Sequence, residues 1–456
     1  MYATWMADKN PFHVKDYRRW FVGETLLSVS AGMGLATMLL AVEIFDSVAT
    51  AGLFFSVVSL LGILGSAVGG SLADSVQRRS LFKVFSPVVI ICSLGIAITV
   101  SGYFYANWTT QAAVVAISSF VLISSAITGV LDPVMDAALK NVISPEQFPR
   151  AVGAAEARES TISIAASPVS GALYSVLAPA PFVVQFFCNL GFYINALAIR
   201  TPLGPNKEKG VGLGDEEQTE THDSPPTGWR RNLTTKLSGG YGPAWRFLRE
   251  RNALFRILLS APLINLFVFG TFSWTTFYLS DAGEPGWLIG LVMAGFSISS
   301  LLGSALVPWL TDRYSPGLLV VVGLGSMLVF FAVFLFLAAS PWVMLVVSLA
   351  CMLPSTALNA ALFGHVFAVT PQDLQGRVMA IFIVVSSAIS VVVPTLAGTM
   401  VESGTRFWFA AVVIGTGIVG WLLLAGSREV RAMRNEEPDG DNGGGDTGDH
   451  EDPENL

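Results

Sequence analysis

The stretch of sequence that decides the fold is Gly70-Ser71-Leu72-Ala73-Asp74-Ser75-Val76-Gln77-Arg78-Arg79. Uncharged runs long enough to cross a bilayer lie on both sides of it. The carboxylate of Asp74 is suited to the positive N-terminal end of another helix, an interaction worth roughly 0.3–1 kcal/mol. Gly70 is expected to let two helix backbones approach closely. Arg78 and Arg79 are expected to hold this turn on the cytoplasmic side of a membrane.

The composition of the whole chain agrees with a membrane protein. Only 13% of the 456 residues are charged, whereas soluble domains carry about 25%. Apolar residues make up 52% of the chain, and its mean hydropathy is +0.60. These values exclude an ordinary soluble enzyme and predict helices that lie side by side in lipid.

Charged residues and histidines divide the chain into nine uncharged runs of spanning length. Six are long enough for one helix, and three, 84–131, 160–199 and 317–364, are long enough for two. Polar or proline-containing midpoints mark where the long runs fold back, namely Tyr103 to Gln111, Pro179 with Pro181, and Ser340-Pro341. The sequence therefore predicts an all-α integral membrane protein with twelve transmembrane helices.

The basic residues predict the orientation of these helices. Of the 26 Lys and Arg residues, only Arg406 falls in a loop on the outer side if the N-terminus lies inside. Because cytoplasmic loops carry the excess of Lys and Arg, both termini are expected in the cytoplasm. Residues 1–19 are polar and lack a cleavage site, so they are interpreted as a cytoplasmic arm. We expect a multi-pass protein of the plasma membrane.

The two halves of the chain repeat each other. Pro168 and Pro394 lie 226 residues apart, and the segment from Ser144 to Phe148 corresponds to that from Thr370 to Leu374 at the same offset. A second acid and arginine, Asp312-Arg313, follow Pro308 between the eighth and ninth predicted helices. Parallel repeats of six helices with a site between them are typical of secondary transporters.

The repeat and the charge distribution predict the domain organisation. The six-helix halves are pseudo-symmetric, and residues 201–252 form a cytoplasmic linker that ends in an interfacial helix. The acidic tail is expected to be disordered. The predicted units are 1–19, 20–200, 201–252, 253–427 and 428–456.

The spacing Gly70-x-x-x-Asp74-x-x-x-Arg78-Arg79 resembles the loop between helices 2 and 3 of the major facilitator superfamily. This resemblance implies a transporter that works by alternating access. It also implies that Asp74 contacts the start of helix 11, near Gly376 and Arg377. The repeated pair Asp312 and Arg313 would form the corresponding latch against helix 5.

Helix 5 carries Ser167-Pro168-Val169-Ser170-Gly171, which resembles the Gly-Pro-x-x-Gly element of exporters in that superfamily, with Ser167 in place of the usual glycine. Three shorter stretches resemble the branch of enterobactin exporters and macrolide efflux proteins. They are Tyr17 to Gly23, Ala244 to Arg249, and Leu374 to Met379. The resemblance implies export.

Several charged residues lie within the predicted spans. Asp132 and Asp136 on helix 4 are at a depth similar to that of Arg158 on helix 5, roughly 12 Å from the inner surface. Because a charge in a span costs on the order of 2.5–3.5 kcal/mol, we expect an ion-pair or hydrogen-bond cluster of these three residues. A structural salt bridge and a proton-coupling role both remain open. The other candidates are Glu24, which could simply reach the inner surface, and Glu156.

The energy source is expected to be an ion gradient, because the chain has no Gly-x-x-x-x-Gly-Lys phosphate loop. Proton-coupled efflux of a small amphipathic or lipophilic compound, such as a drug, a macrolide or a siderophore-like molecule, is the leading hypothesis. The alternatives are a proton-coupled importer and a non-transporting membrane receptor. The candidates for lining the substrate path are Asn189, Asn265, Trp274 and Asn359.

Other functional classes lack the residues they need. His365 is the one histidine near a span, and it has no cysteine or acid at ligand spacing, so neither a metal site nor hydrolytic chemistry is expected. We predict no enzymatic activity and no cofactor. The expected partners are a small-molecule substrate, protons and membrane lipid, without nucleic acid, and the protein is expected to be a monomer.

Overall fold

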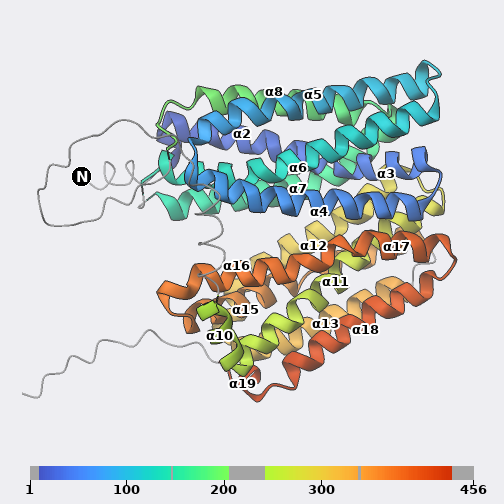
Figure 1. The fold of residues 1–456 in the computed structure, drawn as a ribbon. Coiled ribbons are helices and arrows are strands. Elements are labelled where there is room, and N and C mark those ends of the chain that lie inside the picture. Colours follow the sequence, from blue (N-terminus) through green and yellow to red (C-terminus); the bar gives the residue numbers. More distant parts are fainter. Residues whose placement is uncertain (1–9, 145–146, 205–241, 337–339, 434–456) are drawn as a thin grey trace, which may run out of the picture.

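The computed structural model describes residues 10–144, 147–204, 242–336 and 340–433, and every regular element in these ranges is a helix. Figure 1 shows two helical bundles stacked on each other, one for each half of the chain. The N-terminal bundle contains η1 (Pro11–His13), α2 (Lys15–Gly32), α3 (Gly34–Phe45), α4 (Val48–Ser75), α5 (Arg78–Tyr105), α6 (Thr110–Val142), α7 (Phe148–Val176) and α8 (Ala180–Ala198).

The C-terminal bundle repeats this arrangement with more interruptions. It contains α10 (Gly242–Glu250), α11 (Asn252–Asp281), α12 (Gly286–Arg313), α13 (Pro316–Phe336), α14 (Pro341–Cys351), α15 (Ser355–Val369), α16 (Gln372–Ala388), η2 (Ile389–Val391), α17 (Val393–Glu402), α18 (Arg406–Ala425) and α19 (Arg428–Arg431).

Twelve membrane-spanning segments follow from these helices, six in each half, as the sequence predicts. Eleven segments of the described chain are long and apolar enough to cross a membrane. Three of them join shorter helices, namely α2 with α3, α14 with α15, and α16 through η2 to α17. The twelfth is α7, whose 29 residues include Arg150, Arg158 and Glu159, and it packs against α12 and α2.

The spans run alternately between two sides of the molecule. We call the side where α2 begins and where α8 and α18 end the terminal side, at the left of Figure 1, and the opposite side the distal side. The three long uncharged runs fold back where the sequence predicts. α5 ends at Tyr105 before α6, α7 ends at Val176 before α8, and α13 ends at Phe336 before α14.

The first span is interrupted at Met33, which lies between Gly32 and Gly34. The backbone groups that this break releases are satisfied by Ser170 of α7, whose hydroxyl donates to the Met33 carbonyl (3.1 Å) and accepts from the Ala36 N–H (3.0 Å). Lipid offers no partner for such groups, so a side chain from a neighbouring helix must supply it. The break therefore fixes the first span against α7.

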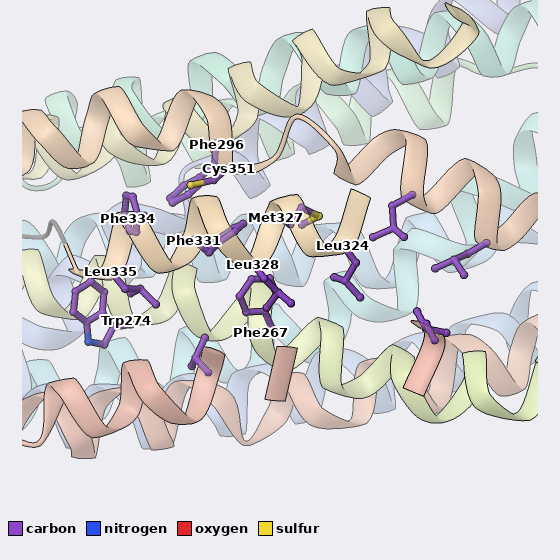
Figure 2. Packing of buried hydrophobic residues seen from close by; sticks show 14 of the residues in the cluster. Phe267, Trp274, Phe296, Leu324, Met327, Leu328, Phe331, Phe334, Leu335 and Cys351 are labelled. Atoms are coloured by element: carbon purple, nitrogen blue, oxygen red, sulfur yellow. The ribbon is translucent and has the colours of Figure 1, made fainter. Parts of the chain in front are cut away.

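The C-terminal half has an aromatic core, which Figure 2 shows from close by. The rings of Phe267 and Phe331 lie 4.8 Å apart, and Phe296 stacks on Phe331 at 5.8 Å. These residues come from α11, α13 and α12, and all are buried. The core therefore holds three spans of this half together as one body.

Close packing in the N-terminal half depends on glycines of α4, but Gly70 is not one of them. A side chain at Gly65 or Gly69 would collide with the α6 backbone, at Ala126 and Val130 respectively. A side chain at Gly70 would meet nothing within 4 Å. The expectation that Gly70 permits the close approach was wrong in this conformation, because the face of α4 that carries Gly69 meets α6.

Candidate functional site

An ion pair lies inside the N-terminal bundle. The Nη2 atom of Arg158 on α7 is 3.4 Å from Oε2 of Glu24 on α2 and 3.8 Å from Oε2 of Glu159. The Arg158 and Glu24 side chains are only 10% and 14% exposed. The guanidinium also lies near the rings of Trp20 and Phe21, at 6.0 and 5.4 Å from their centroids. Pairing and aromatic contacts reduce the cost of placing these charges in a span.

The expected pairing of Arg158 with helix 4 was wrong, because the first span lies between α6 and α7. Tyr17 of α2 donates to the Ala151 carbonyl of α7 (3.4 Å), and the Trp20 indole donates to the Met135 carbonyl of α6 (3.1 Å). With α2 held in this position, Arg158 meets Glu24. Glu24 therefore does not simply reach out to the inner surface.

The two acids of α6 are part of the same electrostatic environment. Asp132 and Asp136 are close enough to act on the Glu24 carboxylate, and both of their side chains are exposed. Glu159 accepts a hydrogen bond from Ser28 of α2 at 2.7 Å and is 54% exposed. Two carboxylates thus contact the guanidinium, and two further acids act on one of them. Within the described chain, this group of acids inside the spans is the best candidate for a site that binds protons or cations.

A hydrogen-bonded contact joins the two halves at the distal side. Oε2 of Glu402, the last residue of α17, accepts from the Ala49 N–H and from the Ser47 hydroxyl, each at 2.7 Å. Ser47 is the N-cap of α4. The carboxylate of one half therefore sits at the positive N-terminal end of a helix of the other half. Two turns further into the same interface, the hydroxyls of Ser56 and Thr395 lie 2.6 Å apart.

The helix-5 element that resembles the exporter motif lies at the other contact between the halves. A side chain at Gly171 would collide with the Gly286 backbone of α12, and one at Gly290 would collide with Ser167 and Pro168. The repeat partner behaves similarly, since Gly398, four residues after Pro394, approaches the α4 backbone at Val48. In both halves a proline and a small residue thus permit close contact with the opposite half near the distal side.

Of the two predicted latches at the terminal side, the described residues include the acid of only one, Asp312, and this latch is not formed. Asp312 and Arg377 are exposed, and Asp312 has no hydrogen bond or ion pair within the described ranges. Arg313 lies over the Trp309 ring at 5.9 Å instead. The side chains of Asp74 and Glu156 and the surroundings of Gly376 lie outside the described part of the chain.

Arg78 and Arg79 form contacts that the sequence did not predict. Arg78 is buried, and its guanidinium binds the Asn141 side chain and donates to the Gly204 carbonyl at 3.0 Å. Arg79 donates to the Leu197 carbonyl at 2.9 Å. Both arginines therefore bind the end of α8 and the segment that follows it. They hold the start of the linker against α5 within one half.

Two of the four residues predicted to line the substrate path are packing residues. Asn189 is 4% exposed and donates to Ser93 of α5 at 2.8 Å, inside the N-terminal bundle. Trp274 is 2% exposed and stacks on Tyr278 at 4.7 Å, within the core where Figure 2 shows it near Leu335. The structure corrects both expectations. Asn265 donates to the Ser386 carbonyl of α16 at 3.0 Å, and Asn359 is exposed on α15.

Sequence reasoning missed Glu402, Ser47 and Ser28. The signal for Glu402 was present, because this acid ends an uncharged run of spanning length, as Asp74 does after its own run. Ser47 could have been recognised as an N-cap residue directly before a span. Ser28 carried no signal, because its role depends on the relative rotation of α2 and α7.

Comparisons with known proteins agree with this architecture. The model of the family described as the Major Facilitator Superfamily matches residues 21–355 and 286–443. Comparison with curated protein sequences gives no significant match.

Among solved structures, the chain is similar to a bacterial homologue of the iron transporter ferroportin in its inward-facing state, with 13% identity and a TM-score of 0.69 over 92% of this chain and 99% of that one. It is also similar to a D-xylose-proton symporter, with 12% identity and a TM-score of 0.61 over 90% and 96% of the two chains. A nucleoside transporter has 16% identity and a TM-score of 0.59 over 90% and 99%. These likenesses concern the fold.

The family match extends over most of the chain, and both the repeat and the twelve spans agree with it. The protein is therefore a transporter rather than an enzyme, and it belongs to the major facilitator superfamily.

Proposed function

We propose that the protein exports a small amphipathic or lipophilic compound from the cytoplasm in exchange for protons. The Glu24–Arg158 pair, with Asp132 and Asp136 beside it, is the observation that carries this proposal. Acidic side chains within spans commonly serve as proton relays in pumps and transporters. Asp132 has no hydrogen bond or ion pair within the described ranges and is our candidate for the proton carrier, because protonating it breaks no structural contact.

Alternating access supplies the mechanism. With the terminal side in the cytoplasm, as the distribution of Lys and Arg indicates, the hydrogen-bonded Glu402 contact closes the outer side. The exposed Asp312 belongs to the inner side, which would be open to the cytoplasm in this state. Proton binding in the acidic cluster would change the balance between this state and its outward-open counterpart. Two states of similar energy are what such a cycle requires.

The chemistry of the cluster also suggests which substrates are tolerated. An excess of acids over the one arginine of this cluster favours neutral or cationic groups over anionic ones. Asn265 and Asn359 stay our candidates for polar contacts with the substrate. We place the protein in the plasma membrane as a monomer, with both termini in the cytoplasm.

An importer remains the second candidate, because the same fold serves solute–proton symporters such as the xylose transporter named above. Export is favoured by the helix-5 element, whose Ser167, Pro168 and Gly171 form a contact between the halves. A non-transporting receptor is the third candidate. It would not require a switchable contact at Glu402.

Accumulation assays in an efflux-deficient bacterial host test the proposal. Cells with and without the protein would receive a panel of lipophilic dyes, macrolides, siderophores and divalent metal ions, before and after a protonophore. We expect lower accumulation of at least one organic compound, abolished by the protonophore. Higher accumulation would establish import, and export of metal ions alone would contradict the proposed substrate class. The absence of any effect across the panel, despite normal membrane insertion, would favour a receptor.

A further inference from the structure

Two hollows adjoin at the terminal ends of α2 and α8, outside the charge cluster described above. One, of about 340 Å³, is lined by Val14, Lys15, Asp16, Arg19 and Arg200. The other, of about 320 Å³, is lined by Lys15, Arg18, Arg19, Val22 and Asn195. They share Lys15 and Arg19, and we refer to the two adjoining hollows together as the depression. Figure 1 shows the two helices beside each other at this end of the bundle.

The frame of this depression is built from hydrogen bonds. Asp16 accepts from the Arg200 N–H (3.0 Å), the Thr201 N–H (2.8 Å) and the Thr201 hydroxyl (2.7 Å) through Oδ2. Its other oxygen accepts from Arg19 at 2.9 Å, and Arg19 also donates to the Ala198 carbonyl at 2.6 Å. Asp16 is therefore fully engaged, and its contacts fix the segment after α8 against α2.

Three cations in the depression lack a counter-charge. The side chains of Lys15, Arg18 and Arg200 form no hydrogen bond or ion pair with any described residue, and all three residues are exposed. With Arg19 and Asp16 included, four positive charges face one negative charge. The Asp16 frame brings these like charges together, and an anion between them would remove the repulsion.

The lining becomes apolar toward the membrane. Lys15, Arg18 and Val22 share one face of α2, because residues three, four and seven apart lie above one another on a helix. Val22 is 46% exposed, and on α8 Ile194 and Phe187 are 58% and 62% exposed. Both helices are among the membrane-spanning segments. A ligand here would have a negative head at the membrane surface and an apolar tail along the spans.

We propose that this depression binds the phosphate headgroup of an anionic phospholipid of the inner leaflet. Lys15, which lines both hollows, binds the headgroup together with Arg18 of one hollow and Arg200 of the other, and the acyl chain lies along Val22. The occupant is a lipid rather than free phosphate because Val22, an exposed apolar residue of a membrane-spanning segment, lines one of the hollows. This inference rests on the proposed orientation, with the terminal side in the cytoplasm, and it does not depend on the transported substrate.

Native mass spectrometry of the purified protein in detergent tests the proposal, with phosphatidylglycerol, phosphatidylcholine or inorganic phosphate added at equal concentrations. The variant Arg18→Gln/Arg200→Gln removes two cations from the depression and leaves the Asp16 frame intact. The matched control is Arg428→Gln/Arg431→Gln, which removes two exposed cations of α19 on the same side of the molecule. Melting temperatures without lipid verify that both variants fold.

We expect the wild-type protein and the control to retain phosphatidylglycerol in preference to phosphatidylcholine. The Arg18/Arg200 variant should bind it about 25-fold more weakly, at roughly fivefold for each basic side chain near an anionic surface. Equal binding by the variant and the control would overturn the proposal. Equal stabilisation by inorganic phosphate would also overturn it, because the ligand would then be a free anion rather than a lipid.

Discussion

The carboxylate of Glu402 and the backbone N–H of Ala49 join the two halves of the protein through a 2.7 Å hydrogen bond at the distal side. The same oxygen accepts from the Ser47 hydroxyl, so an acid at the end of α17 caps the start of α4. The resemblance to the superfamily implies the reciprocal arrangement at the other side, with Asp74 at the end of α4 against the start of α16. One helix pair would thus carry an acid latch at each end.

Weakening this latch should shift the conformational balance. Glu402→Gln removes the charge from two solvent-exposed hydrogen bonds, so we expect a total loss of about 1.4 kcal/mol, below the range for a buried bond to an ionised group. We expect the population with an open distal side to rise about tenfold, since 1.4 kcal/mol corresponds to a factor of ten. Spin labels at Ala106→Cys and Ala282→Cys, exposed residues of opposite halves, would report the distance between the distal loops.

The matched control is Glu43→Gln. Glu43 also lies near the distal side and accepts a hydrogen bond, but its partner Tyr174 belongs to the same half. This variant should leave the distance distribution unchanged. The latch would be refuted if both variants gave the wild-type distribution, or if both opened the distal side equally.

Closure of the distal side should require the glycine contact between α7 and α12. Gly171→Ala places a methyl group against the Gly286 backbone, where no flexible side chain can move away. We expect slower transport and a larger population open at the distal side, measured with the same spin labels. Gly34→Ala is the control, because a side chain there meets nothing within 4 Å. Normal closure in the Gly171 variant would contradict this account of the contact.

The ion pair of Glu24 and Arg158 should appear as a thermodynamic coupling. Removing one partner of a buried ion pair lowers the free energy of unfolding by about 3–5 kcal/mol. Because both side chains of this pair keep some exposure, we expect a loss of up to about 3 kcal/mol. We therefore expect Arg158→Gln and Glu24→Gln each to lower thermal stability, and the double variant to lose less than the sum. The effects of Arg158→Gln and Asp132→Asn on thermal stability should add when the two substitutions are combined. Coupling to Asp132 alone would restore the pairing with helix 4 that the sequence suggested.

Hydropathy determines the positions of the spans, which is why they could be predicted. Charges are excluded from lipid, so uncharged runs locate the helices, and midpoints such as Ser340-Pro341 locate the turns. The uncharged run 160–199 covers only the later part of α7, because Arg158 and Glu159 of this helix lie before it. The break at Met33 was not predicted, because it depends on Ser170 of a distant helix as a partner.

The candidate site could be predicted only in part, because charge and spacing do not determine helix rotation. Arg158 was identified as a partner in a buried pair, yet the choice of Glu24 depends on α2 lying between α6 and α7. Asn189 and Trp274 were expected beside the substrate because they are polar or aromatic within spans. Their burial inside the bundles follows from which helix face points inward, and single residues give no evidence of this.

Transport into proteoliposomes under an imposed pH gradient tests the central claim most directly. Vesicles with an acidic or an alkaline lumen would be given a substrate found in the accumulation assays. This substrate should be neutral or permanently charged, so that the pH gradient alone does not distribute it across the membrane. Proton exchange predicts that the wild-type protein accumulates substrate in the acidic lumen. The Asp132→Asn variant should lose this uphill transport while substrate exchange persists. The control Asp281→Asn, which changes an exposed acid at the end of α11, should have normal activity. Accumulation in the alkaline lumen instead, or unchanged coupling in Asp132→Asn, would contradict the account.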